Sequence, residues 1–146
     1  GISRLTDMGV EPFLVSASVR AFLAQRLVRR LCPSCKVTQD YTAEHLESVG
    51  FPDGYNGDFY VAAEEGCDRC RNSGYLGRLA IYEVCLVTPG IEELIVRGAS
   101  TAEIKTKALE EGFVPMRDYG WHKVMSGDTT LEEVLAATTV ELRVDV

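Results

Sequence analysis

The stretch Cys32-Pro33-Ser34-Cys35 organises this chain, because a second stretch of the same form, Cys67-Asp68-Arg69-Cys70, follows it after residues 36–66. Two C-x-x-C pairs supply four thiolates, the number that a tetrahedral Zn²⁺ needs for full coordination. Four sulfur ligands leave no open position, so such a metal is structural and does not activate water. The sequence therefore predicts a structural zinc site with the ligands Cys32, Cys35, Cys67 and Cys70.

Two other states of these cysteines stay open from the sequence alone: a pair of disulfides, or a pair of redox-active dithiols. No secretory signal is recognisable, and cytosolic thiols stay reduced, which favours zinc. Zinc with four thiolates carries a net negative charge, and we expect Lys36, Arg69 and Arg71 to offset it. The fifth cysteine, Cys85, lies in an apolar run and is expected to be a small buried side chain.

The composition points to one domain, or to one small domain with an insertion, in a chain of 146 residues. No apolar run approaches the length of a membrane span, and no apolar leader begins the chain, so we expect a cytoplasmic protein. The net charge of −7 is uneven: residues 1–36 hold six basic and two acidic residues, and the rest hold nine basic and twenty acidic. This acidic surface argues against general nucleic-acid binding.

Apolar spacing predicts short helices on both sides of the cysteine pairs. Over residues 13–31 the spacing favours a helix, whereas the apolar run 79–86 and the short run 59–61 favour strands. Capping residues and helix-stopping glycines predict helices over 2–8, 43–49, 89–97, 101–111, 115–126 and from 131 onward. Thr42 is the expected cap of the second of these, and Ser100 and Thr130 begin capping boxes that Glu103 and Glu133 complete.

No motif for phosphate binding or hydrolysis is present. The chain has no G-x-x-x-x-G-K-[ST] loop, not even one Gly-Lys pair, and neither a G-x-S-x-G nor an H-E-x-x-H motif. Nothing in the sequence can therefore wrap the phosphates of a nucleotide as a P-loop does. We assign no catalytic residue.

Five stretches resemble one known family, the type II secretion and type IV pilus assembly ATPases of the general secretory pathway protein E type. Together they run through nearly the whole chain in order, and what they match is the C-terminal third of such an enzyme. The stretches are Arg4–Leu14, Ala24–Cys35, Gly74–Arg78, Ile81–Val84 and Gly127–Leu135.

The resemblance implies an α+β fold: the C-terminal remnant of a RecA-like motor domain, built from an antiparallel hairpin and C-terminal helices, with an inserted tetracysteine zinc subdomain. Residues 21–31 and 78–86 become the hairpin strands, which overrules the helical interpretation of 21–31. The expected division is 1–31, end of the motor domain; 32–76, zinc insertion; and 77–146, returning strand and helical subdomain.

The resemblance also implies a function. Members are hexameric motors in the cytoplasm beneath the inner membrane, working with secretion or pilus platform proteins, without nucleic acid and without a membrane span of their own. Their ATP and Mg²⁺ sites lie upstream of the position of Gly1, so ATP binding is expected only in the full-length protein. Nothing in the sequence separates the secretion branch from the pilus branch.

One alternative from another class is a free-standing zinc module that binds nucleic acid or protein. The segment 36–76 carries eight acidic residues, which repel phosphates and disfavour it. With the segment hanging from a hairpin, we also expect loss of zinc to unfold residues 32–76 and to spare the helices from Pro89 to Thr138.

Because no phosphate-binding loop is present, we predict that this chain alone neither binds ATP tightly nor hydrolyses it. Release of phosphate from ATP and Mg²⁺ by highly purified protein is the measurement. A rate above that of a buffer control would contradict the prediction.

Overall fold

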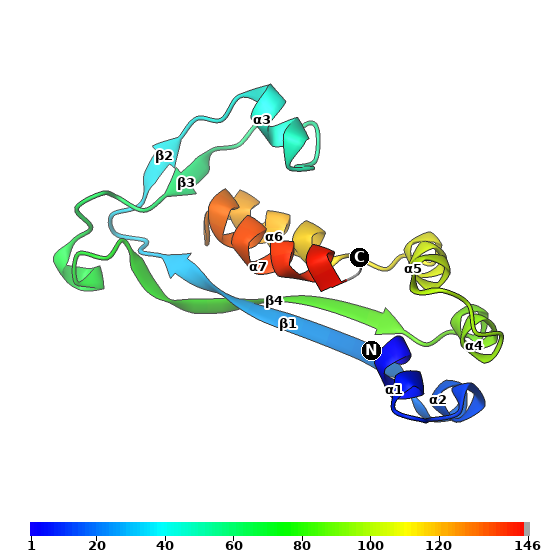
Figure 1. The fold of residues 1–146 in the computed structure, drawn as a ribbon. Helices are drawn as coiled ribbons and strands as arrows, with labels where there is room; N and C mark the ends of the chain where they lie inside the picture. Colours follow the sequence, from blue (N-terminus) through cyan, green and yellow to red (C-terminus); the bar gives the residue numbers. More distant parts are fainter. Residues whose placement is uncertain (145–146) are drawn as a thin grey trace. The chain divides into compact units, whose positions relative to one another are not determined.

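The structure is a computed structural model that describes residues 1–144, with side chains through residue 139. Figure 1 shows how its helices and strands follow one another. The helices are α1 (Ile2–Asp7), α2 (Pro12–Ser18), α3 (Ala43–Ser48), the 3₁₀ turn η1 (Asp68–Cys70), α4 (Pro89–Val96), α5 (Thr101–Glu110), α6 (Met116–Met125) and α7 (Leu131–Val144). The strands are β1 (Ala21–Leu31), β2 (Val37–Gln39), β3 (Phe59–Val61) and β4 (Tyr75–Leu86).

The long strands β1 and β4 are paired in a two-stranded sheet, and their arrows run in opposite directions in Figure 1. The helical interpretation of residues 13–31 is therefore right only for its first part, where α2 begins at Pro12. The helix ends at Ser18, and the backbone of Val19 after it is extended at φ −82° and ψ 127°. Pairing with β4 decides the conformation beyond it, since tertiary context overrides a weak periodic signal.

The segment between β1 and β4 contains a second small sheet, β2 with β3, in which Val37 lies opposite Val61 and Gln39 opposite Phe59. Strand β3 lies where the sequence predicts it, whereas β2 is exposed along its whole length and had no apolar signal. Thr42 begins α3 as predicted: its Oγ1 accepts a hydrogen bond from the backbone N–H of His45 at 3.1 Å. The fold is therefore mixed α/β with two small antiparallel sheets.

The chain divides into two compact units, each made of two separate stretches of the sequence. Unit 1 consists of Gly1–Ala24 and Glu83–Val114. Its core joins α2, α4 and α5 through five buried side chains: Val15, Ile91, Ile95, Ile104 and Ala108. Helices from two stretches that lie far apart in the sequence thus share one core.

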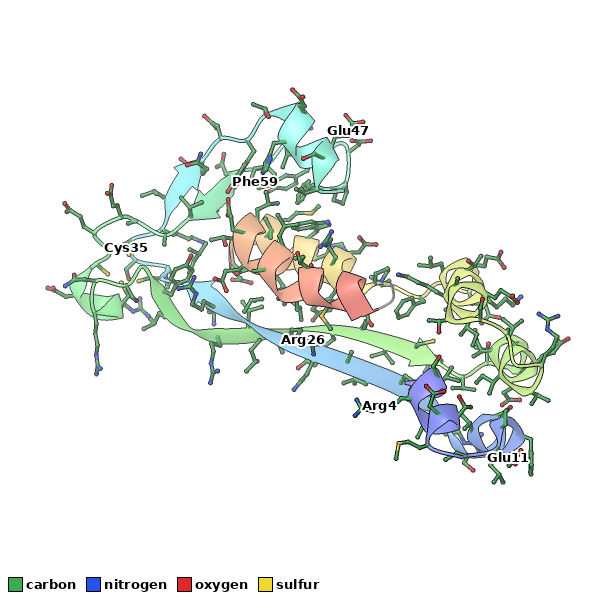
Figure 2. The ribbon with its side chains drawn as sticks, in the orientation of Figure 1. Arg4, Glu11, Arg26, Cys35, Glu47 and Phe59 are labelled. Carbon is green, nitrogen blue, oxygen red and sulfur yellow. The ribbon has the colours of Figure 1, made fainter. Side chains whose placement is uncertain are left out.

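Unit 2 consists of Gln25–Tyr82 together with the chain from Pro115 onward. Its core combines Phe51 and Phe59, from the segment between the cysteine pairs, with buried residues of the C-terminal helices. Phe51 packs on Trp121 with ring centroids 5.4 Å apart, and Phe59 points toward α6 and α7 in Figure 2. The helical members of this core are Trp121, Val124, Leu131 and Val134.

This shared core argues against the expectation that loss of zinc spares all the helices from Pro89 to Thr138. Helices α4 and α5 belong to unit 1, but α6 and α7 bury their apolar residues against Phe51 and Phe59. The reason is the small apolar content of the segment, which is too low to form a core without them.

We predict that Phe51→Ala destabilises unit 2 by about 3–5 kcal/mol, because a 5% exposed ring leaves a cavity among three aromatic neighbours. Urea unfolding followed by the fluorescence of Trp121, the single tryptophan, measures the effect. The control Phe13→Ala removes a ring that is 58% exposed and should change stability by less than about 1 kcal/mol. Equal effects of the two substitutions would contradict this description of the core.

Candidate metal centre

The structure brings the four predicted ligands together at the ends of the two long strands. Cys32 follows β1, and Cys35 lies three residues further on. Cys67 directly precedes the 3₁₀ turn η1, and Cys70 is the last residue of that turn, shortly before β4. Figure 2 labels Cys35 in this region. Their four Sγ atoms all lie within 4.8 Å of one another, close enough to hold one metal ion. Cys32 and Cys70 are buried, and Cys35 and Cys67 are half-buried.

The distances between sulfurs fit a tetrahedral metal. Sγ of Cys32 lies 3.7 Å from Sγ of Cys67, and Sγ of Cys70 lies 3.8 Å from those of Cys35 and Cys67. A tetrahedron with metal–sulfur bonds of about 2.3 Å has edges of about 3.8 Å. All four cysteines are free thiols here, and these separations are far longer than a disulfide bond of about 2.05 Å. The donor set suits zinc or iron, the metals of four-sulfur tetrahedral sites.

Backbone N–H groups around the second cysteine pair donate hydrogen bonds that stabilise negative charge on Sγ of Cys70. The N–H groups of Cys67 and Gly74 donate to Sγ of Cys70 at 3.3 and 3.1 Å. The carbonyl of Gly74 accepts from the N–H of Cys32 at 2.9 Å, so one glycine contacts both cysteine pairs. Gly74 has φ +80°, and a Cβ there would lie 2.6 Å from Cβ of Ala62. This role of Gly74 was not predicted from the sequence, although a glycine four residues after the second C-x-x-C pair was a usable signal.

The pKa values of the thiols differ because their surroundings differ. Burial opposes charge on Cys70, but hydrogen bonds from the backbone of Cys67 and Gly74 outweigh it and lower the pKa of its thiol to about 6. Burial and the neighbouring thiols raise the pKa of Cys35 to about 12. The pKa of Cys32 is also lowered: burial opposes ionisation, and hydrogen bonds from Ser34 and from Cys67 favour it. Four thiolates packed this closely therefore need a cation among them.

Two of the three basic residues expected to offset this charge, Lys36 and Arg69, have other partners. The ammonium of Lys36 donates to the carbonyl of Gly127 at 2.9 Å and lies 4.4 Å from the ring centroid of Tyr60. The guanidinium of Arg69 donates to Oγ of Ser34 at 2.9 Å, which joins the two cysteine pairs through their side chains.

The fifth cysteine lies outside the metal-binding group. Cys85 is half-buried in unit 1, and burial is the main cause of its raised pKa. His45 is exposed on α3, where its ring stacks on that of Tyr41. Among the residues that the structure describes, the four clustered cysteines are the one group of metal-binding side chains brought together in this way.

Residues 1–136 match the family described as "Type II/IV secretion system protein". The chain belongs to this family. Across residues 1–144, none of the helices is long and apolar enough to cross a bilayer.

Relatives of two kinds share this similarity. The "Type IV pilus assembly ATPase PilB" of Myxococcus xanthus (strain DK1622) is 47% identical over 138 residues, which cover 94% of this chain and 24% of the relative. That of Thermus thermophilus is 44% identical over 137 residues, 94% of this chain and 15% of the relative. The "Type II secretion system ATPase E" of Vibrio cholerae is 39% identical over 137 residues, 94% of this chain and 27% of the relative. The chain thus spans about a quarter or less of these relatives.

We predict that Gly74→Ala weakens zinc binding at least about tenfold, because it displaces an N–H donor of Cys70 as well as crowding Ala62. Gly77→Ala is the matched control, since Gly77 has a similar φ of +76° but open space around it. Both substitutions carry a backbone strain of about 1–2 kcal/mol. Competition with a coloured chelator measures the affinities, and equal losses would contradict the role given to Gly74.

Proposed function

We propose that this chain is the C-terminal part of a hexameric motor ATPase that powers type II protein secretion or type IV pilus assembly. The observation that supports this most is the match of residues 1–136 to the family, together with relatives named for both activities. ATP and Mg²⁺ would be held by segments outside this chain. The motor would work in the cytoplasm at the inner membrane, against platform proteins of the secretion or pilus machinery.

Within that motor, β1 and β4 would belong to the sheet of the RecA-like domain. A two-stranded sheet is marginal by itself, which supports the presence of further strands in the longer protein. Exposed apolar side chains on β1 and β4 support the same proposal; they are Leu23, Leu27, Tyr82, Val84 and Leu86.

We also propose that Cys32, Cys35, Cys67 and Cys70 bind one structural Zn²⁺. The sulfur separations of 3.7–3.8 Å and the N–H donors to Cys70 support this role. When bound, zinc supplies a cross-link between two parts of the chain, with no coordination position left for substrate or water. The alternative of a nucleic-acid module is disfavoured by the acidic residues of 36–76, all eight of which are exposed.

The coding sequence upstream of Gly1 and the activity of the whole gene product test the proposal that this chain is part of a motor ATPase. We expect the coding sequence upstream of Gly1 to contain a G-x-x-x-x-G-K-[ST] loop, and the whole product to hydrolyse ATP in a Mg²⁺-dependent reaction. A whole product without this loop, or one that is complete at Gly1, would overturn the assignment.

The metal assignment is tested by elemental analysis of protein purified without added metal. We predict one zinc per chain, little or none in Cys67→Ser, and one zinc again in the control Cys85→Ser, whose sulfur lies outside the group. Much less than one equivalent in the wild type would show that the four cysteines do not form a zinc site.

A further inference from the structure

The loop between α6 and α7 lies along the edge of β1, next to the first cysteine pair. The N–H of Leu31 donates to the carbonyl of Asp128 at 2.8 Å. Oγ1 of Thr129, which is fully buried, donates to the carbonyl of Arg29 at 2.8 Å. The loop therefore satisfies the backbone groups of β1 immediately before Cys32.

On the other side of the same cysteine pair, Lys36 also contacts the α6–α7 loop. Lys36 follows Cys35 directly, and its ammonium donates to the carbonyl of Gly127 while lying over the ring of Tyr60. Gly127 has φ +78°, and a Cβ there would lie 2.9 Å from the Nζ of Lys36. Leu31 and Lys36 thus contact consecutive residues of the loop from the two ends of one cysteine pair.

The start of α7 is fixed by the same region. Oγ1 of Thr130 accepts the N–H of Glu133 at 3.0 Å, as the predicted cap requires. The carboxylate of Glu133 accepts hydrogen bonds from the backbone N–H of Arg29 at 2.9 Å and from its guanidinium at 2.8 Å. These bonds connect the start of α7 to β1. The neighbouring Glu132 accepts the hydroxyl of Tyr41 at 2.6 Å. Adjacent carboxylates at one helix start therefore bind β1 and the cysteine segment.

We propose that Leu31 and Lys36 are positioning residues that couple the metal site to the α6–α7 loop, so that order in this loop and at the start of α7 depends on the metal-bound conformation of the first cysteine pair. The proposal rests on the zinc site proposed above. Cys32 and Cys35 fix the backbone between the two positioning residues when they share an ion with Cys67 and Cys70. Without the ion, the positions of Leu31 and Lys36 are no longer held together.

The decisive variant is Lys36→Met, which keeps all four cysteines but removes the donor to Gly127. We expect one zinc per chain to remain and the amides of Leu31 and Asp128 to exchange hydrogen about tenfold faster, the loss expected for one hydrogen bond. Lys36→Arg keeps a cationic donor and should restore most of the protection. Lys105→Met, at an exposed position of α5 in unit 1, is the matched control and should leave both amides unchanged.

A second experiment removes the metal through Cys67→Ser in the full chain, and NMR measures amide hydrogen exchange at single residues. We expect this variant to lose zinc. Its amide hydrogens at Leu31 and Asp128, and along α6 and the described part of α7, should exchange at least about tenfold faster than in the wild type. The amides of α4 and α5 in unit 1 should stay within about twofold of the wild type.

The outcomes separate this proposal from the zinc assignment. Retained protection at Leu31 and Asp128 in zinc-free Cys67→Ser, or in zinc-loaded Lys36→Met, overturns the coupling and leaves the zinc site standing. A wild-type chain without zinc overturns the zinc assignment and the coupling with it. Uniform loss of protection in both units of Cys67→Ser, with no local effect of Lys36→Met, also overturns the proposal, because it reports global unfolding.

Discussion

The four sulfur atoms at the two ends of residues 36–66 lie within 4.8 Å of one another, and this is the geometric constraint around which unit 2 is arranged. Residues 36–66 leave the end of β1 and return beside it, and the distances between the cysteines at the two ends are those of a metal tetrahedron. Closing such a loop opposes chain entropy, and binding of a structural metal can supply on the order of 10 kcal/mol toward it. Two backbone hydrogen bonds of Gly74 add to the same junction, one to Cys70 and one from Cys32.

The closed segment does not form a core by itself but shares one with the C-terminal helices. Phe51 and Phe59 meet Trp121 of α6 and the apolar face of α7, while Glu132 and Glu133 tie the helix start to Tyr41 and Arg29. A metal held by the four cysteines, as proposed, would act through these contacts on helices distant in sequence, without any chemistry of its own.

The sequence predicts the local features well where one residue decides them. Thr42, Ser100 and Thr130 each accept the backbone N–H three residues on, as their capping patterns indicate, and the four cysteines meet as their spacing implies. Periodicity fails for 21–31, whose strand exists because β4 lies beside it. The shared aromatic core and the bond from Lys36 to Gly127 could not be predicted, because both join residues far apart in the chain. The capping box predicted at Thr130 is formed in its first half, whereas the carboxylate of Glu133 bonds Arg29 of the neighbouring strand.

X-ray absorption at the zinc edge of the purified chain tests the central claim most directly, because it reports the identity and distance of the atoms that bind the metal. The account predicts four sulfur neighbours at about 2.3 Å and no nitrogen or oxygen neighbour in the first shell. A spectrum that requires nitrogen or oxygen ligands, or a chain that carries iron in place of zinc, would contradict it.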